Sequence, residues 1–150
     1  MKSLSNIELS KMLSKHKLLC NDICYKSDLK PHLTNGWYII NMEDKTKTSK
    51  GTHWVAFYYG KKTPSIYFDS FGIDCPEIVD RKLKTFIITN KQIQDDDSES
   101  CGWFCFLIIF YFQNKAPTLD TFNNFINLWS LDTKKNETIL KELMSKIEKI

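Results

Sequence analysis

An uncharged, apolar run of ten residues, Trp103–Phe112, limits the folds that are open to this chain. The run contains no proline or glycine, and it is about half as long as the ~20 residues that a membrane-spanning helix needs. A buried helix is the favoured interpretation, with a buried strand as the alternative, because periodicity cannot separate the two in a run that is apolar throughout. The run therefore predicts a central element that other parts of the chain cover.

Cys101 and Gly102 stand immediately before this run, after a polar segment. If the run is helical, Cys101 lies at the helix N-terminus, where unpaired backbone N–H groups and the positive end of the helix dipole favour an anion. A thiolate is such an anion, and this position lowers a thiol pKa and makes a nucleophile. The alternative is a structural cysteine that only begins a helix.

The length and the cysteines suggest a reduced, single-domain protein. A chain of 150 residues with 42% hydrophobic content is predicted to form one domain over residues 1–150. The N-terminal residues lack the apolar segment of a signal peptide. An odd number of cysteines without an export signal predicts free thiols. Their spacing does not match a zinc site, so we expect no metal; the five are Cys20, Cys24, Cys75, Cys101 and Cys105.

The net charge of the chain excludes few classes of function. A formal net charge of +3 permits contact with nucleic acid or a membrane surface without implying either. Arg81 is the only arginine, and guanidinium groups are the usual readers of base edges, so a sequence-specific nucleic-acid reader is disfavoured.

Hydrophobic patterns and turn residues predict an α+β domain with a central mixed or antiparallel sheet flanked by helices. A capping box at Ser5 begins a short helix, and Pro76 opens another. Further helices are expected in the segments Trp103–Phe112, Asp120–Leu131 and Lys134–Ile150, and segment Asn21–Leu29 is expected to be irregular. Strands are expected in the segments Gly36–Met42, Thr52–Tyr59, Ser65–Asp69 and Thr85–Thr89, with a short edge strand at Gln92–Gln94.

Three further residues fit the chemistry of a cysteine nucleophile. The short turn after Tyr59 predicts a hairpin that brings His53 near Asp69, as a base and the carboxylate that orients it. Gln94 precedes Cys101 by seven residues, and its amide N–H and the Cys101 backbone N–H form a plausible donor pair for an oxyanion. Each residue also has a structural alternative: His16 and His32 are other histidines, Asp74 is a competing carboxylate, and Gln94 fits a solvated loop.

Three blocks of this sequence resemble the adenain-type cysteine proteases: G-T-H-W-V-A (51–56), Y-F-D-S-F-G (67–72) and Q-D-D-D-S-E-S-C-G-W-F-C (94–105). That family includes the adenovirus maturation protease and relatives in virophages, polinton transposons and large DNA viruses, and its clan contains the SUMO-specific proteases. The resemblance covers roughly residues 5–112. It implies a papain-like or adenain-like fold, with the roles of base for His53, orienting carboxylate for Asp69, nucleophile for Cys101 and oxyanion donor for Gln94.

The resemblance also implies a substrate and a setting. Trp54 and Gly102 would contact substrate in a narrow cleft, and cleavage would occur at Gly-containing sites of viral capsid or core precursor proteins. We expect a monomer in the virion, the host cytoplasm or the viral factory, with no membrane partner. The chain is shorter than the adenovirus enzyme, so no cofactor is expected to be required, although an activating peptide or non-specific DNA is possible by resemblance.

One departure from the family lies between Gln94 and Cys101, where Asp95, Asp96 and Asp97 replace small or uncharged residues. Carboxylates that are close and poorly solvated would raise the thiol pKa, whereas a solvated loop would be screened beyond about 8–10 Å. A solvated loop is the favoured interpretation. The alternative hypothesis is that this loop lines the substrate groove and selects basic residues.

Three other functions fit the same residues. A deubiquitinase-like or deSUMOylase-like isopeptidase would use the same site on a folded modifier. An acyltransferase would use the same triad with acetyl-CoA. A non-catalytic, mildly basic binding module would retain the site without using it.

Overall fold

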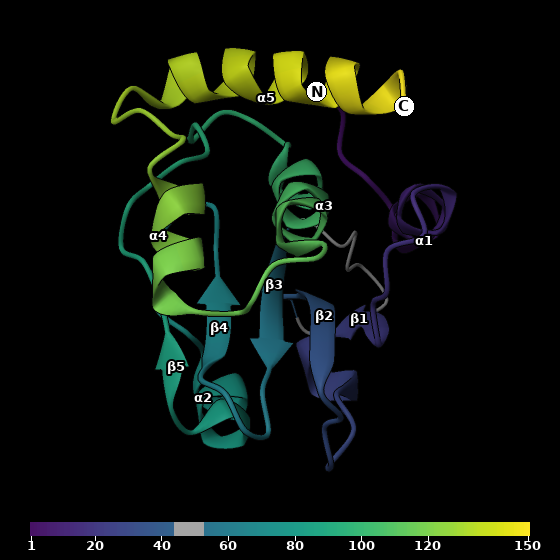
Figure 1. The fold of residues 1–150 in the computed structure, drawn as a ribbon, viewed down its shortest axis with the longest axis vertical. Coiled ribbons are helices and arrows are strands. Elements are labelled where there is room, and N and C mark those ends of the chain that lie inside the picture. The colour runs from purple at the N-terminus through teal and green to yellow at the C-terminus, as the bar shows by residue number, and fades with distance from the viewer. Residues whose placement is uncertain (44–52) are drawn as a thin grey trace.

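The structure is a computed structural model that describes residues 1–43 and 53–150 (Figure 1). Over those residues the chain is α+β, with a five-stranded mixed sheet and five α-helices. The strands are β1 (Asp22–Tyr25), β2 (Gly36–Asn41), β3 (Trp54–Tyr59), β4 (Ser65–Phe68) and β5 (Phe86–Ile87). The helices are α1 (Asn6–Lys15), α2 (Glu77–Leu83), α3 (Cys101–Phe112), α4 (Leu119–Ile126) and α5 (Thr133–Glu148), and a 3₁₀ turn, η1, covers Lys26–Asp28.

The strands follow chain order across the sheet, β1-β2-β3-β4-β5. Strands β2, β3 and β4 are antiparallel neighbours, and the two edge strands pair in parallel, β1 with β2 and β5 with β4. The predicted hairpin is confirmed, because Ala56 pairs with Phe68 and Tyr58 with Ile66. As a result, the residue before β3 and the residue after β4 lie at the same end of the sheet (Figure 1).

The apolar run is a helix, as the favoured interpretation predicted. Nine of the twelve residues of α3 are buried, and α3 lies over β3 in the middle of the molecule (Figure 1). Alternation along the strands divides the core in two, as a sheet covered on both faces requires. One face carries Ile39, Ala56 and Phe68 toward α3, and the other carries Ile40 and Val55 together with residues of α2.

The helix predictions hold, with shifted ends. Ser5 caps α1 in a full capping box with Glu8, as the sequence predicted. The amphipathic segment predicted to run to Leu131 ends as a helix at Ile126, and Asp132 caps α5 separately. Figure 1 shows α5 lying across the end of the sheet where β4 ends and β3 begins.

Two predictions about strands were wrong. Segment Asp22–Tyr25, expected to be irregular, is strand β1, whose four residues are all half-buried and therefore show no alternation. Segment Gln92–Gln94, expected to be an edge strand, has no strand structure, because the backbone N–H groups of Ile93 and Gln94 both bond to the carbonyl of Ser70. Strand β5 covers only two of the five residues expected. Thr52, the expected start of β3, lies outside the described residues.

None of the five cysteines forms a disulfide. In the parts of the chain that the structure describes, none of the helices combines the length and apolar composition needed to cross a bilayer.

Candidate active site

His53 and Asp69 meet at the end of the β3–β4 hairpin. His53 comes directly before β3 and Asp69 directly after β4, and the antiparallel pairing brings them together. The Nε2 atom of His53 lies 2.9 Å from Oδ1 of Asp69, and the Asp69 side chain is only 2% exposed. Oδ1 also accepts a hydrogen bond from the backbone N–H of Phe71 at 2.8 Å. The carboxylate is therefore fixed by its own turn while it bonds to the imidazole.

Cys101 is the first residue of α3 and lies beside the start of β3. The backbone N–H of Trp54 donates to its Sγ atom at 3.3 Å. The residue is 2% exposed, so its sulfur is shielded from water and lies beside a helix N-terminus, the positive end of the helix dipole. Because His53 is the chain neighbour of Trp54, the same strand start that contacts the sulfur also carries the imidazole.

The electrostatics of the site favour a protonated imidazole. Burial lowers the pKa of His53, but side-chain hydrogen bonding and the negative charges of Asp69 and Cys101 raise it more strongly, from 6.5 to about 9. An imidazolium next to a thiolate is the resting form of an activated cysteine nucleophile.

The second ring nitrogen of His53 is available for proton transfer. Nδ1 is buried and completes no hydrogen bond among the described residues. Cys101 nevertheless lies near enough for side-chain hydrogen bonding to raise the His53 pKa, so the two groups are close without full alignment. Loose alignment of this kind is common in catalytic pairs before substrate binds.

Gln94 is buried, at 1% exposure, so the alternative of a solvated loop residue is wrong. Its Oε1 atom accepts a hydrogen bond from the Ser70 hydroxyl at 2.6 Å, and its Nε2 atom donates to the carbonyl of Ser98 at 3.0 Å. An amide nitrogen carries two protons, so one N–H remains for an oxyanion. Ser70 follows Asp69 in the sequence and bonds to Gln94. It therefore links the His53–Asp69 pair to Gln94.

The two predicted substrate contacts, Trp54 and Gly102, lie beneath the N-terminal segment. The indole N–H of Trp54 donates to the carbonyl of Leu4 at 2.8 Å, and Trp54 is 5% exposed. A Cβ atom added to Gly102 would lie 3.2 Å from Leu4 Cβ and 3.4 Å from Trp54 Cδ1. These contacts explain why the helix has a glycine directly after Cys101, and contact with substrate stays a prediction for both residues.

Sequence reasoning missed two residues that support the site. Phe71 stacks on the imidazole of His53, with ring centroids 4.8 Å apart and an interplanar angle of 29°. Ser70 orients Gln94, as described above. Both stand in the same sequence block as Asp69, and that adjacency was the only sign of their role.

Two of the three loop carboxylates accept hydrogen bonds from other side chains of the protein. Oδ1 of Asp95 accepts from the hydroxyl of Thr133 at 2.8 Å, and Oδ1 of Asp96 accepts from Nε2 of Gln92 at 2.7 Å. Asp96 and Asp97 are exposed. The selection of basic residues by this loop stays a prediction, and Asp97 is its simplest probe.

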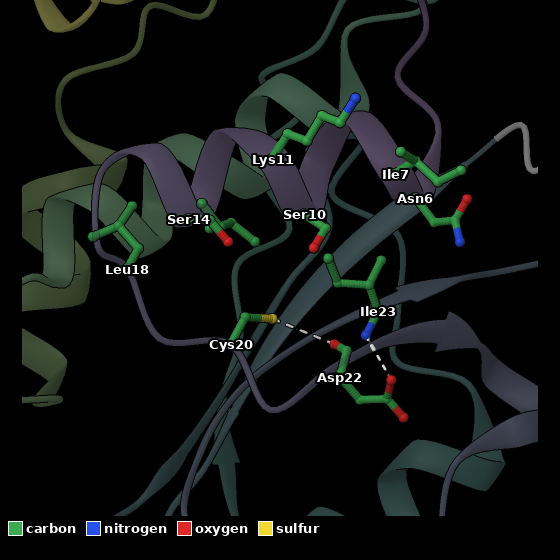
Figure 2. A pocket seen from close by; sticks show the side chains of 10 residues that line it. Asn6, Ile7, Ser10, Lys11, Ser14, Leu18, Cys20, Asp22 and Ile23 are labelled. Atoms are coloured by element: carbon green, nitrogen blue, oxygen red, sulfur yellow. Dashed lines mark hydrogen bonds between the residues drawn. The ribbon is translucent and has the colours of Figure 1, made fainter.

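A separate groove of about 610 Å³ lies between α1 and β1 (Figure 2). It contains one thiol, Cys20, which donates to the carbonyl of Asp22 at 3.3 Å. Burial raises the pKa of Cys20 to about 11, which keeps it protonated and unreactive at neutral pH. None of the residues that line this groove is His53, Asp69, Gln94 or Cys101, so the candidate chemistry lies elsewhere.

Within residues 1–43 and 53–150, no group of three or more His, Cys, Asp or Glu side chains is placed to hold a metal ion. No protein-family model matches this chain, and no curated protein matches it.

Proposed function

We propose that this chain is an adenain-like cysteine endopeptidase, with a papain-like arrangement of nucleophile and base. The observation that carries the proposal is the meeting of three separate segments: the start of α3 with Cys101, the start of β3 with His53 and the end of β4 with Asp69. The order of these residues and their sequence blocks resemble the adenain-type proteases. The contacts in the structure and the resemblance of the sequence blocks are independent in origin, and both concern the same residues.

In the proposed resting site, Nδ1 of His53 already carries the proton taken from Cys101, while Asp69 holds Nε2. The thiolate attacks a peptide carbonyl carbon, and the N–H groups of Gln94 and Cys101 stabilise the resulting oxyanion. The intermediate expels the amine, which takes the proton from His53, and leaves a thioester. Water, deprotonated by His53, then hydrolyses the thioester and releases the acid and the thiolate.

The proposed substrates are viral capsid or core precursor proteins cleaved at Gly-containing sites, in the virion or the viral factory. Small residues suit this site because Cys101 and Trp54 are almost fully buried, which leaves little room beside the sulfur for a bulky side chain. Apart from the substrate and water, the steps above use only side-chain and backbone groups of this chain. Activation by a peptide or by DNA stays a prediction from the resemblance.

Peptide cleavage tests the proposal. Wild type should cleave Gly-containing peptides, and Cys101→Ala should lose turnover while it keeps the fold, as judged by circular dichroism. Reaction with a C-terminally electrophilic ubiquitin or SUMO probe, without peptide cleavage, would favour an isopeptidase. Activity that depends on acetyl-CoA would favour an acyltransferase. Cleavage that persists in Cys101→Ala would contradict the proposal.

A further inference from the structure

The first turns of helix α5 contact the loop that carries Gln94 and leads to Cys101. Figure 1 shows α5 crossing the end of the sheet at which the candidate site lies. The resemblance to known proteases ends at about residue 112, so it assigns no role to this helix. Three of its side chains nevertheless bond to residues that directly flank Gln94 or Cys101: Thr133, Asn136 and Glu137.

Asn136 fixes the segment before Gln94. It is fully buried, and its Nδ2 atom donates to the carbonyl of Ile93 at 3.1 Å and to the carbonyl of Ser130 at 2.8 Å. Its Oδ1 atom accepts from the backbone N–H of Ser130 at 2.7 Å. Both amide protons are thereby used, and a buried, satisfied amide is costly to displace.

Glu137 fixes the segment before Cys101. Its Oε1 atom accepts a hydrogen bond from the hydroxyl of Ser100 at 2.5 Å, and Ser100 is fully buried. The Ser100 hydroxyl also lies 2.9 Å from that of Ser98, whose carbonyl accepts from Gln94. A chain of hydrogen bonds therefore runs from α5 to the residues that hold both oxyanion donors.

We infer that Asn136 and Glu137 are positioning residues, which hold the Gln94 amide and the Cys101 backbone N–H at one fixed separation. This inference rests on the proposed function, because it assigns those two N–H groups to the oxyanion. Preorganised donors stabilise an oxyanion only when their spacing is fixed before reaction. Displacement by about 1 Å lowers turnover by up to roughly 100-fold.

Glu137 gives a sharper test than Asn136, because its partner Ser100 can be substituted separately and Glu137→Gln is a conservative variant. Glu137→Ala should lower kcat by about 10- to 100-fold with KM changed less than about threefold, and Glu137→Gln, which keeps the acceptor Oε1, should restore most of kcat. Ser100→Ala should add little to Glu137→Ala in the double variant. Exposed Glu142 on the same helix supplies the control, since Glu142→Ala should match wild type.

A second readout does not depend on catalysis. In ¹H–¹⁵N spectra, Glu137→Ala should shift the side-chain amide of Gln94 and the backbone amide of Cys101, whereas Glu142→Ala should not. If wild type lacks peptidase activity, the proposed function fails, and these spectra alone decide whether α5 positions the loop. If either the spectra or kcat of Glu137→Ala match wild type in an active enzyme, the positioning role is wrong.

Discussion

The imidazole of His53 and the carboxylate of Asp69 are joined at 2.9 Å where β3 begins and β4 ends. The contact connects residues sixteen positions apart, and it depends on the register of a single hairpin. Asp69 is held by its own turn through Phe71, and Phe71 in turn stacks on the imidazole. The imidazole is therefore held both at its edge and on its face.

Asp69→Asn tests this contact, because it keeps the shape and removes the charge. The pKa of His53, now about 9, should fall toward 6.5, and turnover should fall by roughly 10²- to 10⁴-fold. An NMR titration of the His53 ring, assigned with His53→Gln, measures the first effect. Asp74→Asn is the matched control, since Asp74 is exposed. An unchanged pKa in Asp69→Asn would show that Asp69 does not act on the imidazole.

The raised pKa of His53 predicts a pH dependence of stability. The protonated form is favoured in the folded protein, so its contribution is complete below about pH 6.5 and is lost as pH rises through about 9. At about 1.4 kcal/mol for each pKa unit, the contribution is roughly 3 kcal/mol. The difference in unfolding free energy between wild type and His53→Gln should therefore shrink between pH 6.5 and 9. Urea denaturation at several pH values measures it, and a difference that grows over this range would contradict the sign.

Ser70 should act on turnover through Gln94, because its hydroxyl bonds to the Gln94 amide at 2.6 Å. Gln94→Ala should lower kcat by about 10²- to 10³-fold, as loss of one oxyanion donor does. Ser70→Ala should lower kcat less, and it should have almost no effect when Gln94 is already alanine. Additive losses in the double variant would show that Ser70 does not work through Gln94.

The fold could be predicted from the sequence where it depends on a local pattern. The site could be predicted where the residue types are specific for one kind of chemistry. The apolar run Trp103–Phe112 could only be buried. The turn after Tyr59 required a hairpin, and that hairpin was enough to bring His53 to Asp69. Strand β1 could not be foreseen, because its pairing with β2 is long-range and its half-buried residues show no period. The contact of Glu137 with Ser100 was equally hidden, since 37 residues separate the two.

Gly102 should be intolerant of a side chain because of Leu4. A Cβ atom there would lie 3.2 Å from Leu4 Cβ, and overpacking of this kind costs typically about 1–3 kcal/mol. Alanine is also the better helix former by up to about 1 kcal/mol, so Gly102→Ala should destabilise wild type but stabilise Leu4→Gly, which lacks that Cβ atom. Thermal unfolding of the four proteins measures both effects. Destabilisation of equal size in both backgrounds would exclude Leu4 as the cause.

The central claim of the proposed function is that Cys101 is a nucleophile activated by His53, and alkylation by iodoacetamide tests it most directly. Burial raises the pKa of the other thiols, to about 11 for Cys20, about 12 for Cys24 and Cys75, and well above the ordinary value for Cys105. At pH 6, mass spectrometry of wild type should therefore find modification at Cys101 alone, and His53→Gln should slow it by at least about tenfold. Modification of Cys101 that is as fast in His53→Gln as in wild type would contradict activation of the thiol by His53.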